Sequence, residues 1–389
     1  MLPRMIARRL ARVVRSYARA FKIVAMLGPR QSGKTTLARA VFARKPYISL
    51  EETDERQFAT DDPRGFLARF PRGAVIDEAQ HCPPLFSYLQ SRVDASAARG
   101  QFILTGSQQL GLMENIAQTL AGRVGTVDLL PFSYAELRAA GREPHTLEDA
   151  LFRGGYPPLF DEPAVASVPW LNSYLRTYVE RDVRHALTVR DLPMFRRFLS
   201  LCAGTAGQLL NTVRLGADCG VSHNTVRAWL SVLEAGFVVF QLPPHHENFR
   251  KRLVKTPKLY FHDVGLLVRL LGIETPWQLR AYPLRGAIFE NWVVVELLKA
   301  HLNRGEEPRL FFWRDNVGQE IDVLREQGAR LRAWECKSGM TFVSEWTAGL
   351  AKWSRLAGPK AGALHLVYGG DESFTRQGVR VISWRDVGS

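Results

Sequence analysis

The chain contains little cysteine, and the few cysteines are not arranged for cross-linking or for zinc. Its 389 residues include only Cys82, Cys202, Cys219 and Cys336. None belongs to a CxxC pair, and none has Cys or His neighbours at the spacing of a zinc site. Disulfide bonds and a structural zinc ion are therefore not expected, and the sequence fits a reducing cytosol, which predicts a cytoplasmic protein.

Long apolar runs are also missing. No stretch approaches the roughly 18 residues that span a bilayer, so no membrane span is expected. The first 21 residues, MLPRMIARRLARVVRSYARAF, are rich in arginine and contain no acid. They imitate a mitochondrial transit peptide. Ile6, Leu10, Val13, Val14 and Tyr17 nevertheless recur at helical spacing, which favours a basic amphipathic helix packed on the next domain.

Acidic residues are too few to balance the basic ones. Lys and Arg number 52 against 38 Asp and Glu, which gives a net charge of +14. Such a surplus indicates a polyanionic partner, either nucleic acid or an anionic membrane surface. The hydrophobic content of 46% is ordinary for a globular protein, and the length predicts two to three domains.

Residues 22–36, KIVAMLGPRQSGKTT, predict a phosphate-binding loop between a strand and a helix. Gly28 and Gly33 allow turns that other residues resist, and the loop amides point at phosphate oxygens. Lys34 reaches the β- and γ-phosphates of ATP, and the Thr35 hydroxyl is offered to Mg²⁺. The predicted ATP-contacting residues are Gly28, Pro29, Arg30, Gln31, Ser32, Gly33, Lys34, Thr35 and Thr36.

An acidic pair follows a second short strand, GAVID, and adds the groups that ATP hydrolysis requires. Asp77 is expected to hold Mg²⁺, often through water, and Glu78 to activate the attacking water. The alternative is an acidic pair on a solvated loop.

Three further segments contain candidate contacts to the γ-phosphate. In QFILTGSQQ, Ser107 and Gln108 follow a strand and are sensor candidates, unless they form a simple turn. Arg123 is a candidate catalytic arginine, acting as a sensor in cis or as a finger in trans, with a surface arginine as the equal alternative. Arg181 and Arg184 fit a solvated or subunit-facing surface better.

These motifs, with GGYPPL and YVERDVR, resemble a large prokaryotic family of AAA-superfamily ATPases whose C-terminal domain is of unknown function. The resemblance covers nearly the whole chain. It implies an additional-strand P-loop core in which Lys34, Thr35, Asp77 and Glu78 have their usual roles, with ATP and Mg²⁺ as cofactors. It also implies a cytosolic protein of bacteria or archaea, and it supplies no defined cellular function.

Residues 209–242 predict a winged helix-turn-helix. Gly220 lies in the turn, Ser222 can cap the second helix, and the later strands FVVFQL and KLYFHD would form the wing. The segment between these strands is basic, as a loop that touches phosphates would be. Such domains also bind proteins, so DNA contact is one of two alternatives. The residues expected to face DNA are His223, Asn224, Thr225 and Arg227.

The C-terminal residues follow the PD-(D/E)xK pattern of restriction-endonuclease-like folds. Glu290 lies on a predicted helix, Asp322 on a strand, and Glu335 and Lys337 on one face of the next strand. Asp322 and Glu335 are the predicted Mg²⁺ ligands, Lys337 the charge-stabilising group, and Glu320 an additional or substitute ligand. Such folds also survive as inactive binding modules, and that alternative stays open.

The predicted fold class is α/β, with three successive parts. Residues 1–145 contain the basic helix and the ATPase core, 146–245 a helical lid and the winged helix, and 246–389 the wing, a linker and the nuclease-like domain. The predicted function is ATP hydrolysis coupled to action on DNA, and branched DNA is one of the candidate forms. The alternative is a regulatory switch that binds a protein partner, and a homo-oligomer is compatible with either.

Overall fold

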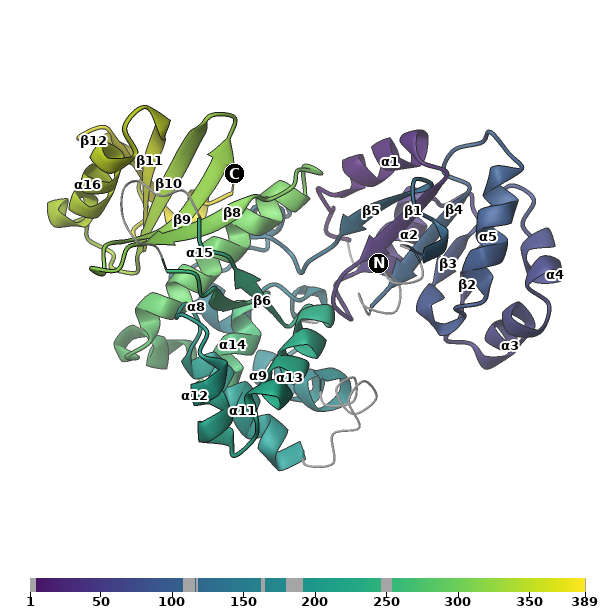
Figure 1. Ribbon diagram of the computed structural model, residues 1–389, viewed down its shortest axis with the longest axis horizontal. Coiled ribbons are helices and arrows are strands. Elements are labelled where there is room, and N and C mark those ends of the chain that lie inside the picture. Colours follow the sequence, from purple (N-terminus) through teal and green to yellow (C-terminus); the bar gives the residue numbers. More distant parts are fainter. Residues whose placement is uncertain are drawn as a thin grey trace. The chain divides into compact units, whose positions relative to one another are not determined.

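The computed structural model describes residues 5–107, 116, 118–161, 165–179, 192–245 and 254–388. Gln108, Arg181 and Arg184 lie outside the described residues. The chain divides into two compact units (Figure 1). Unit 1 comprises residues 1–132, 235–237 and 302–306, and unit 2 comprises the remainder.

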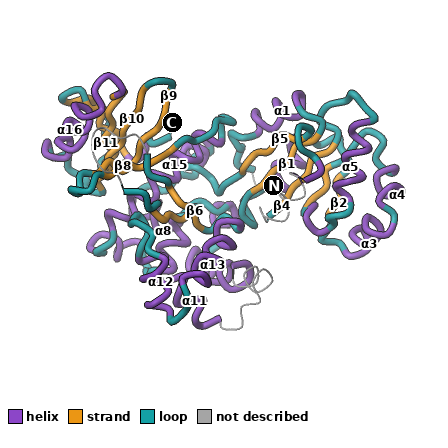
Figure 2. The backbone as a smooth tube through the Cα atoms, viewed as in Figure 1, coloured by secondary structure: helices purple, strands orange, loops and turns teal. Residues whose placement is uncertain are grey.

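Unit 1 is a sheet of five parallel strands flanked by helices (Figure 2). The strand order is β2-β3-β4-β1-β5, so β4 lies between the strand before the phosphate loop and the strand that ends in Asp77. This insertion is the additional strand that the resemblance implied. The elements of unit 1 are α1 Ala11–Ala20, β1 Ile23–Leu27, α2 Lys34–Val41, β2 Tyr47–Ser49, α3 Thr53–Asp61, α4 Pro63–Ala68, β3 Val75–Asp77, the 3-10 turn Ala79–His81, α5 Leu85–Asp94, β4 Phe102–Gly106 and β5 Val124–Asp128.

The N-terminal segment packs on this sheet, as its apolar spacing predicted. Leu10, Val13 and Val14 are buried in one cluster with Val24 and Met26 of β1. Val24 and Met26 are two residues apart, so both point to the face of the sheet that α1 covers. The apolar face of this segment is therefore part of the core of unit 1.

Unit 2 begins with a helical region and ends in a six-stranded mixed sheet. The sheet order is β12-β13-β11-β10-β9-β8. Strands β8, β9 and β10 are antiparallel neighbours, whereas β10, β11 and β13 run parallel. The elements of unit 2 are α7 Tyr134–Ala139, α8 Leu147–Arg153, the 3-10 turn Pro157–Phe160, α9 Ser167–Tyr174, the π-helical turn Leu175–Val179, α11 Leu192–Gly204, α12 Thr212–Cys219, α13 His223–Ala235, β6 Val239–Leu242, β7 Lys258–Phe261, α14 Val264–Leu270, the 3-10 turn Pro276–Ala281, α15 Arg285–Leu302 (its last residue counted in unit 1), β8 Leu310–Arg314, β9 Glu320–Gln327, β10 Arg330–Lys337, the 3-10 turn Ser344–Thr347, α16 Ala348–Ala357, the 3-10 turn Gly358–Lys360, β11 Ala361–Tyr368, β12 Phe374–Arg376, β13 Val379–Ser383 and the 3-10 turn Trp384–Asp386.

The predicted domain limits differ from these units. The first and longest segment of unit 1 ends at Phe132, whereas the limit predicted from the sequence is residue 145. The predicted limit between residues 245 and 246 falls between β6 and β7, which pair as antiparallel neighbours. A strand that donates and accepts hydrogen bonds along its partner cannot be assigned to a different domain, so β7 belongs with the preceding helices.

No helix within the described residues is long and apolar enough to cross a membrane.

Candidate functional site

The phosphate loop is shaped by two glycines. Gly28 has a φ of +148°, and a Cβ built on it would lie 2.2 Å from the carbonyl oxygen of Leu129. Gly33 has a φ of +93° and directly precedes α2, so the loop turns into the N-terminus of that helix. Both positions require glycine because a side chain would meet steric resistance there. The loop therefore places its amides at a helix N-terminus, where phosphate binds.

Lys34 lies folded across the loop. Its Nζ donates hydrogen bonds to the carbonyl oxygens of Gly28 at 2.9 Å and Pro29 at 2.8 Å, and the residue is only 5% exposed. Burial lowers the pKa of Lys34 to about 8, although the carboxylates of Glu78 and Asp77 offset part of the shift. These carbonyls hold the ammonium where a bound phosphate would replace them as its partner.

Asp77 joins the loop to three strands. Its Oδ2 accepts hydrogen bonds from the hydroxyls of Thr35 at 2.8 Å and Tyr47 at 2.6 Å, and its Oδ1 accepts one from Thr105. Thr35 and Asp77 thus lie side by side, as the metal prediction required. Tyr47 and Thr105 were not selected from the sequence, because only the order of the strands brings them to this carboxylate.

Glu78 is held beside Asp77 with its carboxylate fixed by neighbours. Ser107 donates to Glu78 Oε2 from its hydroxyl at 2.9 Å and from its amide at 3.2 Å, and Gln80 donates to the same oxygen. Burial raises the pKa of Glu78, but the charge of Lys34 and these hydrogen bonds outweigh burial and leave the pKa lowered. Glu78 therefore stays ionised and oriented, as a group that positions water must be.

The structure brings Ser107 to this site and keeps Arg123 away. The carbonyl of Arg123 accepts a hydrogen bond from the amide of Ile23, the first residue of β1, whereas the phosphate loop follows the last residue. The Arg123 guanidinium forms two hydrogen bonds of 2.7 Å with the exposed carboxylate of Asp94. Arg123 thus lies a strand length from the loop of its own chain, which does not support the sensor role in cis. A role in trans stays a prediction.

Arg8 makes a contact that was not predicted from the sequence. Its guanidinium donates to the carbonyl oxygen of Ser32 at 2.8 Å and to that of Leu130 at 2.6 Å, and it lies over the Phe132 ring. It therefore ties the phosphate loop to the segment after β5. The sequence drew attention to this segment through its arginine content, which does not indicate which arginine contacts the phosphate loop.

Asp128, at the end of β5, gives a pH-dependent prediction. It pairs with Leu27, the last residue before the loop, and burial raises the pKa of its carboxyl to about 6. The folded-state value exceeds the unfolded one, so ionisation opposes folding, and this cost grows from about pH 4 to pH 6. Asp128→Asn should stabilise the protein above pH 6 by on the order of 2–3 kcal/mol. Urea unfolding across this pH range measures the effect, with exposed Asp61→Asn as control. A gain independent of pH would contradict the prediction.

The helix-turn-helix region is defined as α11, α12, α13, β6 and β7, and its helix α13 has a buried apolar face. Val226 and Trp229 of α13 are buried, and Trp229 packs against Phe195 and Phe198 of α11. The Ser222 hydroxyl accepts a hydrogen bond from the amide of Thr225 at 3.1 Å, which confirms the expected cap. Of the residues expected to face DNA, Thr225 is half-buried and His223, Asn224 and Arg227 are exposed.

The C-terminal acids that the sequence predicted converge, and Glu320 is among them. Carboxylate oxygens of Glu290, Glu320 and Asp322 lie within 4.8 Å of one another. Glu320, predicted only as an additional or substitute ligand, belongs to this group. Glu335 accepts a hydrogen bond of 2.7 Å from Lys337, as expected for two residues that share one face of β10. We call Glu290, Glu320 and Asp322 the carboxylate cluster.

Burial dominates the electrostatics of the cluster. Burial raises the pKa of Asp322 well above its ordinary value, and the carboxylates of Glu290 and Glu335 raise it further. Asp322 Oδ2 also accepts a hydrogen bond of 2.8 Å from the amide of Cys336, which links β9 to β10. Lys258 was not predicted from the sequence, yet its Nζ lies 2.8 Å from Glu290 Oε1 and also pairs with Glu320.

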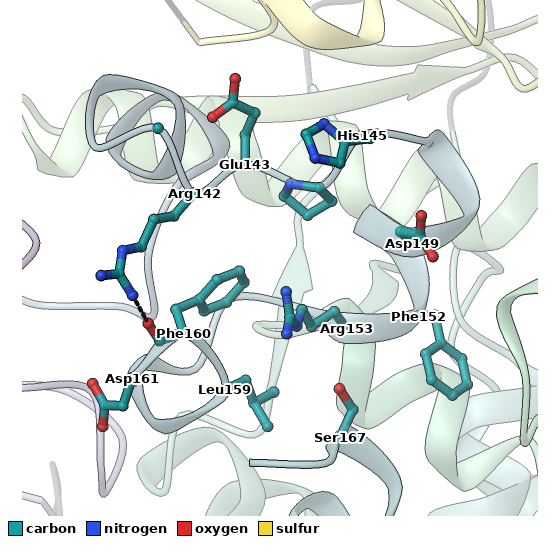
Figure 3. A pocket seen from close by; sticks show the side chains of 12 residues that line it. Arg142, Glu143, His145, Asp149, Phe152, Arg153, Leu159, Phe160, Asp161 and Ser167 are labelled. Carbon is teal, nitrogen blue, oxygen red and sulfur yellow. Dashed lines mark hydrogen bonds between the residues drawn. The ribbon is translucent and has the colours of Figure 1, made fainter. Parts of the chain in front are cut away.

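A separate hollow of about 590 Å³ lies in the helical part of unit 2 (Figure 3). Arg142 donates to the carbonyl of Phe160 at 2.8 Å, and the Arg153 guanidinium lies over the Phe160 ring. None of the residues that line it belongs to the predicted sites. They are Gly141, Arg142, Glu143, Pro144, His145, Asp149, Phe152, Arg153, Leu159, Phe160, Asp161 and Ser167.

The strand order and the loop geometry of unit 1 are those of a P-loop ATPase core, and family comparison agrees. Residues 20–138 match the AAA domain family. Unit 1 is thus an ATP-binding domain of the AAA type. Residues 144–276 and 285–387 match two domains of unknown function, DUF8612 and DUF4143.

Two curated relatives extend this similarity over nearly the whole chain. They are uncharacterized proteins of Mycobacterium tuberculosis (strain ATCC 25618 / H37Rv) and Mycobacterium bovis (strain ATCC BAA-935 / AF2122/97). Each is 32% identical over 368 residues, which is 94% of this chain and 80% of the relative. The chain belongs to the family of these proteins.

Solved structures give looser similarities. A Walker-type ATPase of Pyrococcus abyssi is 16% identical, with a TM-score of 0.44 over 68% of this chain and 96% of that one. AMPPCP-bound DnaA from Aquifex aeolicus is 10% identical, with a TM-score of 0.28 over 58% and 85% of the two chains.

Proposed function

We propose that this protein is an ATPase that acts on DNA and contacts the duplex through α13. The observation that carries the proposal is the exposed N-terminal turn of α13, where His223, Asn224 and Arg227 lie free of the packed apolar face. The three helices and the β6–β7 hairpin would act as a winged helix, in which the second helix of the motif enters a major groove. The net charge of +14 supports a polyanionic partner.

ATP would be held and cleaved at the phosphate loop. Lys34 would transfer its hydrogen bonds from the loop carbonyls to the phosphates, and Glu78 would orient the attacking water. Thr35 and Asp77 offer neighbouring hard oxygen donors, the ligands that Mg²⁺ prefers, so these two residues would hold the ion. The ion would neutralise charge that develops on the phosphates.

The C-terminal sheet would add a second surface for the polyanion. The succession α15, β8, β9, β10, α16, β11 resembles a restriction-endonuclease-like core, and its acids lie on α15, β9 and β10. The carboxylate cluster has the right ligand atoms for Mg²⁺. However, Lys258 already lies among these oxygens, so the cluster as folded does not fit a metal ion.

DNA binding measured against salt tests the proposal. Fluorescence anisotropy with duplex, branched and single-stranded DNA should show binding that weakens steeply between about 50 and 200 mM salt, as counterion release requires. Arg227→Ala should lower the slope of log K against log salt by about 1, which corresponds to one lost phosphate contact. DNA should also raise the rate of ATP hydrolysis.

The matched control is Arg72→Ala, an exposed arginine of unit 1 in the turn before β3. The same charge is lost, but the slope should stay unchanged. If none of the three DNA forms binds at low salt, the proposal fails. ATP hydrolysis that is indifferent to DNA would then favour the alternative, a switch whose C-terminal unit binds a protein.

A further inference from the structure

Two polar side chains of strand β7, Lys258 and Tyr260, contact Glu290 near the start of helix α15. Lys258 and Tyr260 are two residues apart, so they share one face of the strand. Both reach the same oxygen, Oε1 of Glu290: the Lys258 ammonium at 2.8 Å and the Tyr260 hydroxyl as a second donor. Lys258 is 2% exposed and Tyr260 is fully buried. A lysine buried to this degree must be paired, and its partners are the cluster acids.

The same ammonium also contacts the other side of the cluster. Lys258 Nζ forms an ion pair with Oε1 of Glu320, while Arg314 pairs with Oε2 of that residue at 3.1 Å. Burial lowers the pKa of Lys258, but the carboxylates of Glu290, Glu320 and Asp322 more than reverse this and raise the pKa. Lys258 therefore stays charged at the centre of the carboxylate cluster.

A divalent cation would need the oxygens that Lys258 uses. Mg²⁺ binds carboxylate oxygens at about 2.0–2.1 Å, and it would have to do so at Glu290 and Glu320. An ammonium 2.8 Å from the same Glu290 oxygen leaves no room for that ion and repels it. Buried carboxylates can be neutralised by a metal or by a buried base, and in this fold the base is in place.

We propose that Lys258 is the resident cation of the carboxylate cluster and keeps divalent metal out while β7 is docked on α15. The proposal builds on the restriction-endonuclease-like assignment of the C-terminal unit within the proposed function. It predicts a domain whose acids are closed to Mg²⁺ by a residue of the helix-turn-helix region.

Asn291 shows how firmly the strand is docked. Its side-chain amide brackets the backbone of Phe261, accepting from the amide of Phe261 at 2.8 Å and donating to its carbonyl at 2.9 Å. Asn291 is completely buried, and it follows Glu290 directly on α15. Strand β7 pairs with β6, which lies shortly after α13 in the chain. The position of the hairpin thus determines whether the cluster holds an ammonium or is open to a metal ion.

Manganese binding to the nucleotide-free full chain tests this proposal, because electron paramagnetic resonance counts free Mn²⁺ directly. In the wild type and in Lys258→Arg, adding Asp322→Asn should leave the amount of bound Mn²⁺ unchanged, because the carboxylate cluster holds no metal. Lys258→Met and Lys258→Gln should each gain one site at least about tenfold tighter than any wild-type binding there. That site should disappear in the double variants with Asp322→Asn, which separates it from metal held at the ATP site.

Two results would overturn the proposal: Mn²⁺ bound by the wild type but lost in Asp322→Asn, or no gained site in either neutral variant. Removing Lys258 leaves buried acids uncompensated, so thermal unfolding is measured with and without Mn²⁺. Mn²⁺ should raise the midpoint of the neutral variants more than that of the wild type, and the excess should disappear with Asp322→Asn. If both variants stay unfolded at every Mn²⁺ concentration, a metal cannot replace the ammonium and the proposal is wrong. Neither measurement uses DNA, so this result is independent of the DNA-binding test.

Discussion

Glu78→Gln should retain ATP but stop its turnover, with the rate of phosphate release falling by roughly 10²-fold or more. Glutamine keeps the size of the side chain, and its amide can still meet Ser107. However, it carries no charge to polarise the attacking water. The contacts predicted for the nucleotide lie elsewhere, on the loop amides and on Lys34. Binding should therefore survive the loss of hydrolysis.

Lys34→Ala should abolish ATP binding as well as turnover, unlike Glu78→Gln. It removes the positive charge that would contact the phosphates. Glu52→Gln is the matched control: this glutamate of unit 1 is exposed at the start of α3, and its exchange should leave the rate unchanged. The measurements are phosphate release and the nucleotide retained after gel filtration. Hydrolysis at the wild-type rate in Lys34→Ala, or in Glu78→Gln, would contradict the assigned site.

The ATP site could be predicted largely from the sequence, because its main parts are local. The glycines, Lys34 and Thr35 lie within one loop, where the spacing alone fixes the geometry. Asp77 and Ser107 follow separate strands, yet the ends of neighbouring parallel strands meet at one edge of a sheet. The contact between Glu78 and Ser107 follows from that rule once the strands are recognised.

Contacts that depend on tertiary packing could not be predicted in this way. Arg8 meets the loop only because α1 packs on the sheet, and many arginines in that segment share its local pattern. Lys258 meets Glu290 across 32 residues of sequence because β7 docks on α15. No periodicity in KLYF marks the lysine, since a lysine in a short strand normally points to solvent.

The motif for the C-terminal unit predicted its acids and Lys337, but not the lysine that lies among the acids. Alternation along β9 correctly placed Glu320 on the face of Asp322, because side chains two residues apart share a face. The motif also placed Glu335 and Lys337 on one face of β10, where they form an ion pair, but it contained no sign of Lys258. A sequence pattern identifies which acids approach one another, whereas their protonation and partners depend on every element packed around them.

Gly28→Ala should abolish tight ATP binding, and it should destabilise the protein more than an exchange at a comparable glycine. At Gly28 the added Cβ would lie 2.2 Å from the Leu129 carbonyl oxygen, and the φ of +148° disfavours any side chain. Gly122 has a φ of +76°, and a Cβ added there would meet nothing within 4 Å, so Gly122→Ala isolates the backbone strain. That strain costs on the order of 1–3 kcal/mol.

Urea unfolding and titration with a fluorescent ATP analogue would separate the two effects. Gly122→Ala should lose only the strain energy and keep its nucleotide affinity, because its position is remote from the loop in the sheet. Gly28→Ala must move either the loop or the segment after β5, and both carry groups that Arg8 ties together. A displacement of the loop amides by a few tenths of an ångström weakens hydrogen bonds to phosphate steeply, since their strength depends on distance and angle. Equal nucleotide affinities in the two variants would mean that the close approach at Leu129 does not shape the phosphate loop.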